Sequence, residues 1–326
     1  MQLWGKSKLL TQVRCEIKRR NYSVSTERVY IHWMKQYFYY HKLQHPAELS
    51  TQHIEQFLTY LVVKRKVSAS SQSQALNALA FLYKQVLKIE MGQLDNIIRP
   101  KRFEYLPTVL NADEVKVVLN SMTGRPGLAA SLLYGTGMRI NECVTLRVQD
   151  IDISNGAICI HNTKGKKSRY TLLPKQLIKP ITQHLMWRKQ LHINDLNKGW
   201  GYVDLPNALN RKYPKAETRF EWQYAFPSMT INRDDNAAHI VRRWHMSKST
   251  LSKSLKKAVD QCSITKRVTA HTLRHSFATH LLQTGTDIRT IQQLMGHKDL
   301  KTTMIYTHIA ADHCKETKSP FDCLFD

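Results

Sequence analysis

The chain has 326 residues, an apolar content of 42% and a net charge of +24, with 49 Lys and Arg against 25 Asp and Glu. The length exceeds one typical hydrophobic core and predicts two domains of ordinary globular composition. No apolar run is long enough to span a membrane, and the N-terminus lacks the apolar core of a signal peptide. These features exclude a membrane-spanning protein and favour a cytoplasmic one.

The positive charge is spread over the whole chain. Residues 1–100 carry 15 Lys and Arg against 6 Asp and Glu, and the remainder carries 34 against 19. A polyanion such as DNA, contacted by both domains, explains this better than a local basic arm, although a merely soluble basic protein is the alternative. The six cysteines form no C-x-x-C pair and are predicted to be reduced, buried thiols; they are residues 15, 143, 159, 262, 314 and 323.

The first hundred residues are predicted to form helices. Apolar residues at 54, 57, 58, 61 and 62 follow the helical period, and Ser50 stands where a cap is expected. The same period recurs over 76–87 and 29–37. A charged, proline-containing stretch then breaks the pattern. We therefore expect an N-terminal helical domain at 1–100, a linker at 101–108 and a second domain at 109–326.

The second domain is predicted to mix helices with a small sheet. Asn111 and Glu114 have the spacing of a capping box before a helix. Residues 157–160 and 169–173 flank a lysine-rich turn at 163–168, which predicts a β-hairpin. The chain after about residue 174 has helical patterns, except for 199–233, where Trp, Tyr, Phe and Pro mix with little periodicity.

Four residues near the C-terminus suggest chemistry on a phosphodiester. His271 and Arg274 share one side of a predicted helix over 270–283, which Gly285 ends. Gly296 ends the next helix and is followed by His297, and Tyr306 comes within ten residues. Arg139 is expected from a helix that carries Ile140, Cys143 and Leu146.

Such residues can cleave a strand without a metal or another cofactor. Two guanidinium groups can hold both non-bridging phosphate oxygens and stabilise the charge that grows in the transition state. Tyr306 could attack phosphorus, and His271 could take its proton. His271 and His275 also have the histidine spacing of a zinc protease, but Thr272 stands where that motif requires Glu, so we expect no metal. His275 and His280 are predicted to be structural, and Tyr306 could be an ordinary core aromatic.

As a group, these motifs resemble the tyrosine recombinases, whose pattern is Arg…Lys…His-x-x-Arg…His…Tyr. The resemblance covers nearly the whole chain and carries the pattern onto six positions: Arg139, Lys164, His271, Arg274, His297 and Tyr306. It implies a 3′-phosphotyrosyl intermediate with a free 5′-hydroxyl and no need for ATP. It also implies a helical core-binding (SAM-like) domain and an α+β catalytic domain that close as a C-shaped clamp around DNA.

The resemblance assigns supporting roles as well. Glu142 occupies the acidic position expected to orient His271 or Arg139. Lys164 is the expected general acid for the 5′-oxygen, with Lys166 and Lys167 as rivals. Lys166, Lys167 and Arg169 are otherwise expected to contact phosphates without reading sequence.

Residues 199–227 look like the insertion peculiar to integron integrases, and 241–246 resemble the segment that follows it. That family recombines gene cassettes at a folded single-stranded hairpin site and at a duplex site. Unpaired bases can stack on aromatic faces; the candidate DNA-binding residues are Trp222, Arg242, Arg243, Trp244 and His245. The alternative is that these aromatics pack the insertion, which we expect for Tyr224 and Phe226. Trp244 replaces the first of two adjacent histidines common in the family.

The apolar residues Phe321, Leu324 and Phe325 end an otherwise polar tail. The resemblance implies that this tail docks on a neighbouring subunit of a tetramer on DNA, and the alternative is a frayed end. Other interpretations remain open for the whole chain: a Xer-type or phage integrase, a type IB topoisomerase, or a DNA-binding relative without activity.

Overall fold

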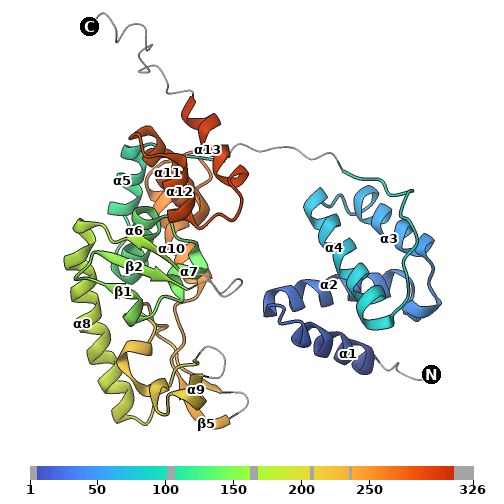
Figure 1. Ribbon diagram of the computed structural model, residues 1–326, viewed down its shortest axis with the longest axis horizontal. Helices are drawn as coiled ribbons and strands as arrows, with labels where there is room; N and C mark the ends of the chain where they lie inside the picture. The colour runs from blue at the N-terminus through green and yellow to red at the C-terminus, as the bar shows by residue number, and fades with distance from the viewer. Residues whose placement is uncertain (1–5, 101–106, 162–167, 206–208, 235–236, 312–326) are drawn as a thin grey trace, which may run out of the picture. The chain divides into compact units, whose positions relative to one another are not determined.

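The computed structural model describes residues 6–100, 107–161, 168–205, 209–234 and 237–311 (Figure 1). Its contacts divide the chain into two compact units, Met1–Tyr105 and Leu106–Asp326. The architecture is mainly helical with a small antiparallel sheet, which confirms the predicted fold class. Within these ranges, no helix is both long and apolar enough to cross a membrane.

The first unit is a helical bundle around an aromatic core. Its helices are α1 (Lys6–Arg19), α2 (Val24–Tyr40), α3 (Thr51–Val63) and α4 (Ala69–Phe81), the last continuing as a π-helical segment over Leu82–Leu87. A short 3-10 turn, Pro46–Glu48, precedes α3. The Tyr37 and Tyr83 hydroxyls lie 2.9 Å apart, and Tyr83 donates to the Pro46 carbonyl over 2.9 Å. Burial and this pairing raise the pKa of Tyr37, so both hydroxyls remain protonated parts of the core.

The second unit combines a small sheet with helices. These are α5 (Ala112–Asn120), α6 (Gly124–Thr136), α7 (Ile140–Val144), α8 (Lys175–Asn197), α10 (Lys248–Gln261), α11 (Ala270–Gln283), α12 (Ile288–Met295) and α13 (Lys301–Ala311). The predicted capping box is confirmed, because the Asn111 side chain accepts from the Glu114 amide and Glu114 accepts from the Asn111 amide, each over 2.8 Å. Helices α6, α10 and α11 supply much of one core, including Ala130, Leu251 and Leu273.

The sheet has the order β1-β2-β3, formed by Ile151–Asp152, Ala157–Ile160 and Arg169–Leu172. Strands β2 and β3 pair antiparallel in the register Cys159 to Tyr170, which confirms the predicted hairpin strands. Thr171 donates to the Thr136 carbonyl at the end of α6 over 3.0 Å. This bond places the start of β3, with Arg169, beside the turn that follows α6.

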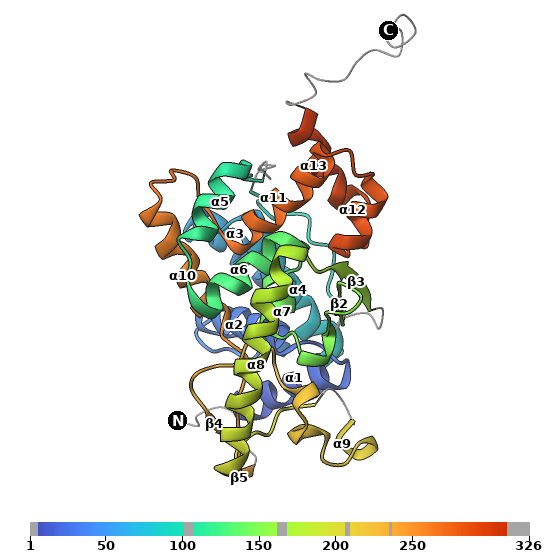
Figure 2. The same cartoon turned by 90° about the vertical axis from the view of Figure 1, so that its left-hand side faces the viewer.

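The chain between α8 and α10 forms a lobe of its own, with α9 (Leu209–Lys212) and short 3-10 turns at Ala216–Thr218 and Phe220–Trp222. Strands β4 (Asn232–Asp234) and β5 (Ala237–Arg242) then pair antiparallel. The expectation of helix after residue 233 is therefore wrong for this hairpin. Tyr224 and Phe226 are buried, as predicted. Figure 2 shows α8 running along the second unit towards this lobe.

Three arginines fasten the lobe to the rest of the unit. Arg147 donates to the carbonyls of Trp222 and Asp204, and its guanidinium lies over the Tyr224 ring at 4.9 Å. Arg188 of α8 is fully buried and donates to the Tyr224 carbonyl and the Gln223 side chain, each over 3.0 Å. Arg243 forms two 2.6 Å bonds with Asp195 of α8. Part of the chain's excess positive charge is thus internal and is not exposed for contact with DNA.

Removing the partner of Arg243 is expected to destabilise the second unit strongly. Asp195→Ala leaves a buried guanidinium without its carboxylate, which costs about 3–5 kcal/mol of the free energy of unfolding. Asp204→Ala is the matched control, because Asp204 pairs with Arg242 over 3.3 Å but is 59% exposed, and exposed pairs contribute about 0–1 kcal/mol. Urea denaturation of the two variants measures the difference. Similar small losses would contradict a structural role for the Arg243–Asp195 pair.

The cysteines are less uniformly buried than expected. Cys143 lies in the core, and its burial raises the pKa of the thiol to about 12. Cys159 and Cys262 are only partly buried, and Cys15 is exposed on α1. The prediction of buried thiols is therefore wrong for Cys15, since a helix in a small bundle keeps one face in solvent. Residues 314 and 323 lie outside the described ranges.

Candidate active site

Tyr306 lies inside the C-terminal group of helices rather than on the surface. It is 1% exposed, on α13, and packs with Phe277 of α11 and with Ile291 and Met295 of α12. Helices α11, α12 and α13 lie together in both views of the unit (Figures 1 and 2). The local sequence explains the arrangement, because the predicted ends of α11 and α12 at Gly285 and Gly296 are confirmed and turn the chain back each time.

Arg274 is the most enclosed cation of the site. It is 3% exposed, and it donates to the Gly137 carbonyl and, over 2.6 Å, to the Met295 carbonyl. Gly137 ends α6 with a φ of +63°, and an added Cβ would lie 2.3 Å from the Phe277 ring. Glycine is therefore required here, both for the left-handed backbone and for the close approach of α11. Burial and the neighbouring Arg139 lower the pKa of Arg274 to about 10, which leaves it charged at neutral pH.

The contacts of His297 define its tautomer. Arg274 Nη2 lies 3.0 Å from His297 Nε2, and a guanidinium can only donate, so Nε2 must accept. The ring proton therefore resides on Nδ1, which donates to the hydroxyl of the buried Thr303 over 2.9 Å. Burial, Arg274 and Arg139 lower the pKa of His297 to about 4, in agreement with a neutral ring. The ring stacks on Tyr306 with centroids 6.2 Å apart.

Glu142 holds two arginines of the site in place. It accepts from the Arg139 side chain over 2.9 Å and from the Arg139 amide over 2.8 Å. It also accepts two bonds from Arg169, over 3.0 and 2.7 Å. Burial acts to raise the pKa of Glu142, but the bonds from Arg169 and Arg139 outweigh it and lower the pKa to about 2. Arg139 caps α7 rather than lying within it, and its second arm donates to the Gly296 carbonyl over 3.2 Å.

His271 and His275 of α11 differ from the prediction in which of them contacts Tyr306. His271, the expected proton acceptor, is exposed. His275, expected to be structural, is half-buried, and its Nδ1 lies 3.0 Å from the Tyr306 hydroxyl oxygen. One turn of helix separates the two, and it is the position i+4 that faces α13. His280 fits the structural expectation, because its Nδ1 pairs with the Tyr134 hydroxyl at 2.9 Å.

The expected DNA contacts have different outcomes. Lys164, Lys166 and Lys167 lie outside the described residues. Arg169 is 13% exposed and donates to Glu142 and to the Leu294 carbonyl, so its guanidinium lies in an internal ion pair in this structure. Arg243 is likewise internal, because its Nε and Nη2 bond Asp195 and its Nη1 donates to the carbonyls of Ser228 and Met229. A DNA contact by either arginine stays a prediction.

The candidate stacking aromatics of the lobe differ in how exposed their rings are. Trp222 is half-buried, packs on the lobe's small core and lies 5.6 Å from the Arg147 guanidinium. His245 is half-buried and bonds the Met246 carbonyl over 2.7 Å. Trp244 is 39% exposed, and Arg242 is partly buried beside Asp204. Of these residues, Trp244 presents the most accessible stacking face.

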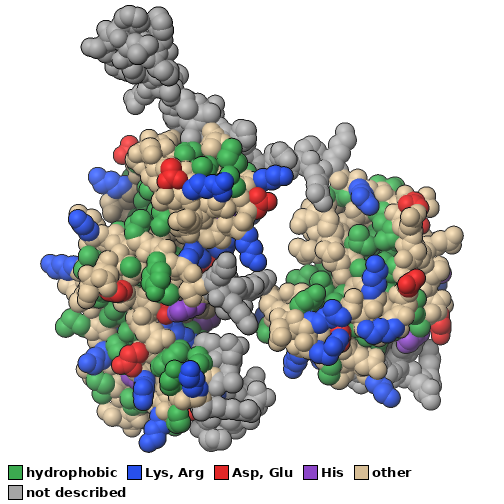
Figure 3. Space-filling view, viewed as in Figure 1, with side chains coloured by type: hydrophobic (Ala, Val, Ile, Leu, Met, Phe, Trp, Pro, Cys, Tyr) green, Lys and Arg blue, Asp and Glu red, His purple; other side chains and the backbone are tan. Residues whose placement is uncertain are grey.

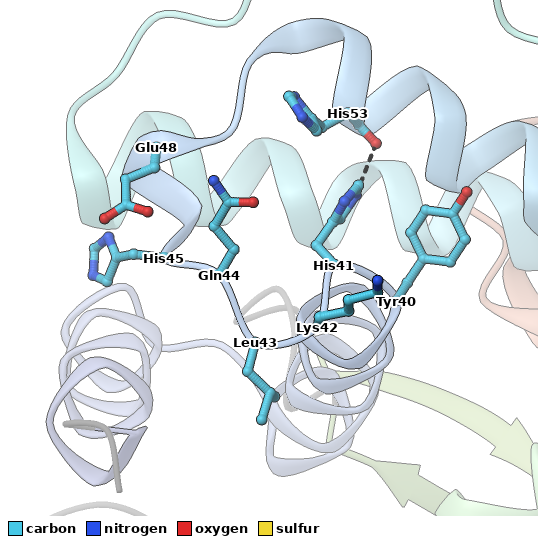
Figure 4. A pocket seen from close by; sticks show the side chains of 8 residues that line it. All are labelled: Tyr40, His41, Lys42, Leu43, Gln44, His45, Glu48 and His53. Carbon is cyan, nitrogen blue, oxygen red and sulfur yellow. Dashed lines mark hydrogen bonds between the residues drawn. The ribbon is translucent and has the colours of Figure 1, made fainter. Parts of the chain in front are cut away.

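Three features outside the site bear on whether the described residues contain a second functional site: surface charge, metal-ligand groups and pockets. Lys and Arg outnumber Asp and Glu on the faces visible in Figure 3. The described residues contain no group of three or more side chains suited to hold a metal ion. A pocket of about 510 Å³ lies in the other unit, lined by residues 40–45, Glu48 and His53 (Figure 4). It contains none of the site residues, and its His41 already bonds the His53 carbonyl over 3.1 Å.

Both units match known protein families. Residues 108–313 match the phage integrase family, and residues 9–93 match the N-terminal SAM-like domain of phage integrases. An integrase/recombinase of Escherichia coli and one of Pseudomonas aeruginosa are each 43% identical over 317 residues, covering 97% of this chain and 94% of theirs. The tyrosine recombinase XerC of Halalkalibacterium halodurans is 29% identical, covering 83% of this chain and 81% of its own.

Solved structures share the fold at lower identity. XerH bound to a palindromic difH substrate is 22% identical with a TM-score of 0.61, covering 96% of this chain and 85% of that one. A lambda integrase dimer bound to a COC′ core site is 16% identical with a TM-score of 0.61, covering 96% and 98%. This mainly helical chain, with these relatives and this fold, therefore belongs to the phage integrase family, the site-specific DNA recombinases that act through a tyrosine nucleophile.

Proposed function

We propose that Tyr306 is the nucleophile that cleaves and rejoins DNA, with Arg139 and Arg274 holding the scissile phosphate. The observation that carries this proposal is the position of Tyr306: it is enclosed by His275 and His297 and lies within the electrostatic reach of both arginines. Burial raises the pKa of Tyr306, whereas Arg274 and Arg139 act to lower it. The cations therefore favour the phenolate that must form during attack.

The proposed reaction conserves the energy of the phosphodiester. Tyr306 Oη bonds to phosphorus as the bond from phosphorus to the 5′-oxygen breaks, and the 5′-oxygen takes a proton, which we assign to Lys164. A 3′-phosphotyrosine and a free 5′-hydroxyl result. Attack by another 5′-hydroxyl reverses the step and exchanges strands. His297 can donate to the phosphate through Nε2 only after Arg274 releases that atom and a proton is gained there, so we expect DNA binding to rearrange the Arg274–His297 bond.

At the finer level, we propose an integron-type integrase that recombines folded single-stranded sites with duplex sites. The insertion expected at 199–227 packs as a lobe with its own apolar cluster of Val203, Leu205, Ala216 and Tyr224. The XerC relatives favour a second candidate, a Xer-type recombinase acting on duplex sites alone. Recombination assays with one folded single-stranded site and one duplex site separate them, because a Xer-type enzyme should act only on the duplex pair.

Trp244→Ala is expected to weaken binding to a hairpin with extrahelical bases more than binding to its fully paired duplex. The exposed indole offers a stacking face, and losing one engaged face costs about 1–3 kcal/mol, or about a 5–150-fold rise in Kd. Duplex affinity depends on phosphate contacts, which this change leaves in place. Gel-shift titrations of both DNAs at one salt concentration measure the two losses.

Trp187→Ala is the matched control for this experiment. Trp187 has the same 39% exposure as Trp244 but lies on α8, outside the insertion and the segment after it. It should leave both affinities unchanged. Equal weakening of hairpin and duplex by Trp244→Ala would contradict the stacking role and with it the proposed preference for folded sites. Trp222→Ala is less informative, because Trp222 also packs the lobe.

We also propose that the enzyme works as a tetramer on DNA, joined through the C-terminal tail. The tail residues Phe321, Leu324 and Phe325 lie outside the described residues, so the support is their apolar character in a polar segment. A chain truncated after residue 311 should still bind a single half-site as a monomer and fail to form the four-subunit complex on two sites.

A further inference from the structure

His275 stands outside the set of residues expected to act, yet it contacts the reacting atom. Its Nδ1 lies 3.0 Å from Tyr306 Oη, with the two rings 5.6 Å apart at 50°. No other hydrogen bond to Tyr306 Oη is found among the described residues. Since Tyr306 is 1% exposed, solvent has little access to its proton, and the proton must pass to a neighbouring group before the phenol can attack.

The surroundings of His275 keep its ring neutral. Burial, His271 on the preceding turn and Arg274 beside it lower the pKa of His275 to about 4. From the other elements, Tyr306 of α13 and His297, which follows α12, face the same space, and Arg139 reaches it from the N-terminus of α7. These neighbours are neutral or positive, so none favours a charged imidazole in the resting state. A neutral imidazole with its proton on Nε2 leaves Nδ1 free to accept from the Tyr306 hydroxyl.

We propose that His275 is a catalytic residue that accepts the proton of Tyr306 as the tyrosine attacks phosphorus. The inference rests on the proposed role of Tyr306 as nucleophile. In the step, the Tyr306 O–H bond breaks and an Nδ1–H bond forms on His275, while the Oη–phosphorus bond forms and the bond to the 5′-oxygen breaks. The transferred proton makes the imidazole cationic as the phosphate gains charge. On rejoining, the tyrosine leaves and recovers this proton from Nδ1.

The exposed His271 has a different setting, with its ring centroid 6.4 Å from that of His275. This position suits a contact with DNA and keeps the family's His-x-x-Arg motif intact. His275 therefore adds a residue to the reaction and does not replace the motif. We assign to His275, instead of His271, only the role of accepting the Tyr306 proton.

The test measures the rate of covalent adduct formation on a nicked suicide substrate with the full chain. His275→Gln is expected to slow cleavage about 10²–10⁴-fold, the usual contribution of a positioned base, while DNA affinity stays close to wild type. Without the base, the phenol must lose its proton to hydroxide. The variant's rate should therefore rise steeply with pH between about 7 and 9, where a base with a pKa of about 4 gives the wild type no such rise.

His280→Gln is the matched control, because it breaks a similar His–Tyr pair on the same helix, with Nδ1 2.9 Å from the Tyr134 hydroxyl. It should leave the rate and its pH dependence unchanged. A second arm places 2,3-difluorotyrosine at 306, whose more acidic phenol should recover much of the rate lost in His275→Gln. Recovery is not expected from a change that merely loosens the fold.

Three outcomes would overturn the proposal. A wild-type rate in His275→Gln would remove His275 from the step. A slower rate with an unchanged pH dependence and no recovery by fluorotyrosine would make it structural only. A faster rate would mean that it restrains Tyr306 in the resting state. If the wild-type chain itself formed no adduct, the proposed function of Tyr306 would fail instead, so the two failures are distinguishable.

Discussion

Tyr306→Phe is expected to reduce covalent DNA–protein adducts and strand transfer to the uncatalysed background. Phenylalanine keeps the ring that packs against Phe277 and stacks on His297, but it has no oxygen to attack phosphorus. The lost hydrogen bond to His275 should cost only about 1 kcal/mol of the free energy of unfolding. Affinity for DNA should stay close to wild type, because phosphate contacts come from basic groups elsewhere.

Two measurements on one preparation check this expectation. Adducts on a nicked substrate are counted by denaturing gel, and affinity for the same DNA is measured by gel shift. Tyr134→Phe serves as the control, because Tyr134 is a partly buried tyrosine whose hydroxyl also bonds a histidine of α11. It should form adducts at the wild-type rate. Adducts at that rate from Tyr306→Phe would remove Tyr306 from the mechanism.

Arg274→Lys is expected to abolish cleavage although it keeps the positive charge. The guanidinium donates to Gly137, Met295 and His297. In the proposed reaction it also holds two phosphate oxygens. An ammonium is a compact cation without this planar fork, so it cannot serve the backbone and the phosphate together. Losing one such donor typically costs about 10²–10³ in rate, and here a two-armed contact is lost.

The rate of adduct formation measures this loss, and the thermal unfolding midpoint shows whether the variant folds. Arg289→Lys is the control, since Arg289 is exposed on α12 and, among the described residues, its side chain makes only a long 3.4 Å bond to Gln292. It should cleave like the wild type. Near-normal cleavage by Arg274→Lys would mean that charge alone suffices at this position, which contradicts a bidentate clamp.

Local sequence patterns predicted the parts of the fold that depend on neighbours along the chain. The Asn111–Glu114 capping box, the strands on either side of the lysine-rich turn and the ends of α11 and α12 all follow from residues a few positions apart. The spacing of His271 and Arg274 likewise placed them on one helix. The His-x-x-Arg motif did not reveal which residues of that helix face α13, because the orientation of a helix depends on its packing partners.

Contacts between distant segments were beyond such patterns. Arg243 and Asp195 are separated by 48 residues, and Arg169 and Glu142 by 27, so neither ion pair has a signature in sequence. The sequence predicted a DNA contact for both arginines, because Arg169 follows the lysine-rich turn and Arg243 stands beside the candidate stacking aromatics. The β4–β5 hairpin was missed for a related reason. Its strands are short and lack alternating apolar residues, so the pairing follows from the lobe around it.

One local feature of the sequence could have helped to predict the site, namely the glycines next to residues of the catalytic pattern. Two glycines, Gly137 and Gly296, have φ angles of +63° and +64° and stand where side chains from other elements pass close to the backbone. A Cβ on Gly296 would lie 2.8 Å from the Arg169 guanidinium carbon. Each glycine adjoins a residue of the catalytic pattern, directly or within two positions. Their carbonyls accept from Arg274 and Arg139, so the turns that end these helices also orient the cations.

The most direct test of the central claim is to trap the covalent intermediate and locate it. The full chain is incubated in EDTA with a nicked substrate whose cleaved 5′ fragment diffuses away, and the adduct is digested and sequenced by mass spectrometry. We predict a single nucleotide-modified peptide with the 3′-phosphate on Tyr306, formed without any divalent ion. An adduct on another residue, or cleavage that appears only when a divalent ion is restored, would contradict the account.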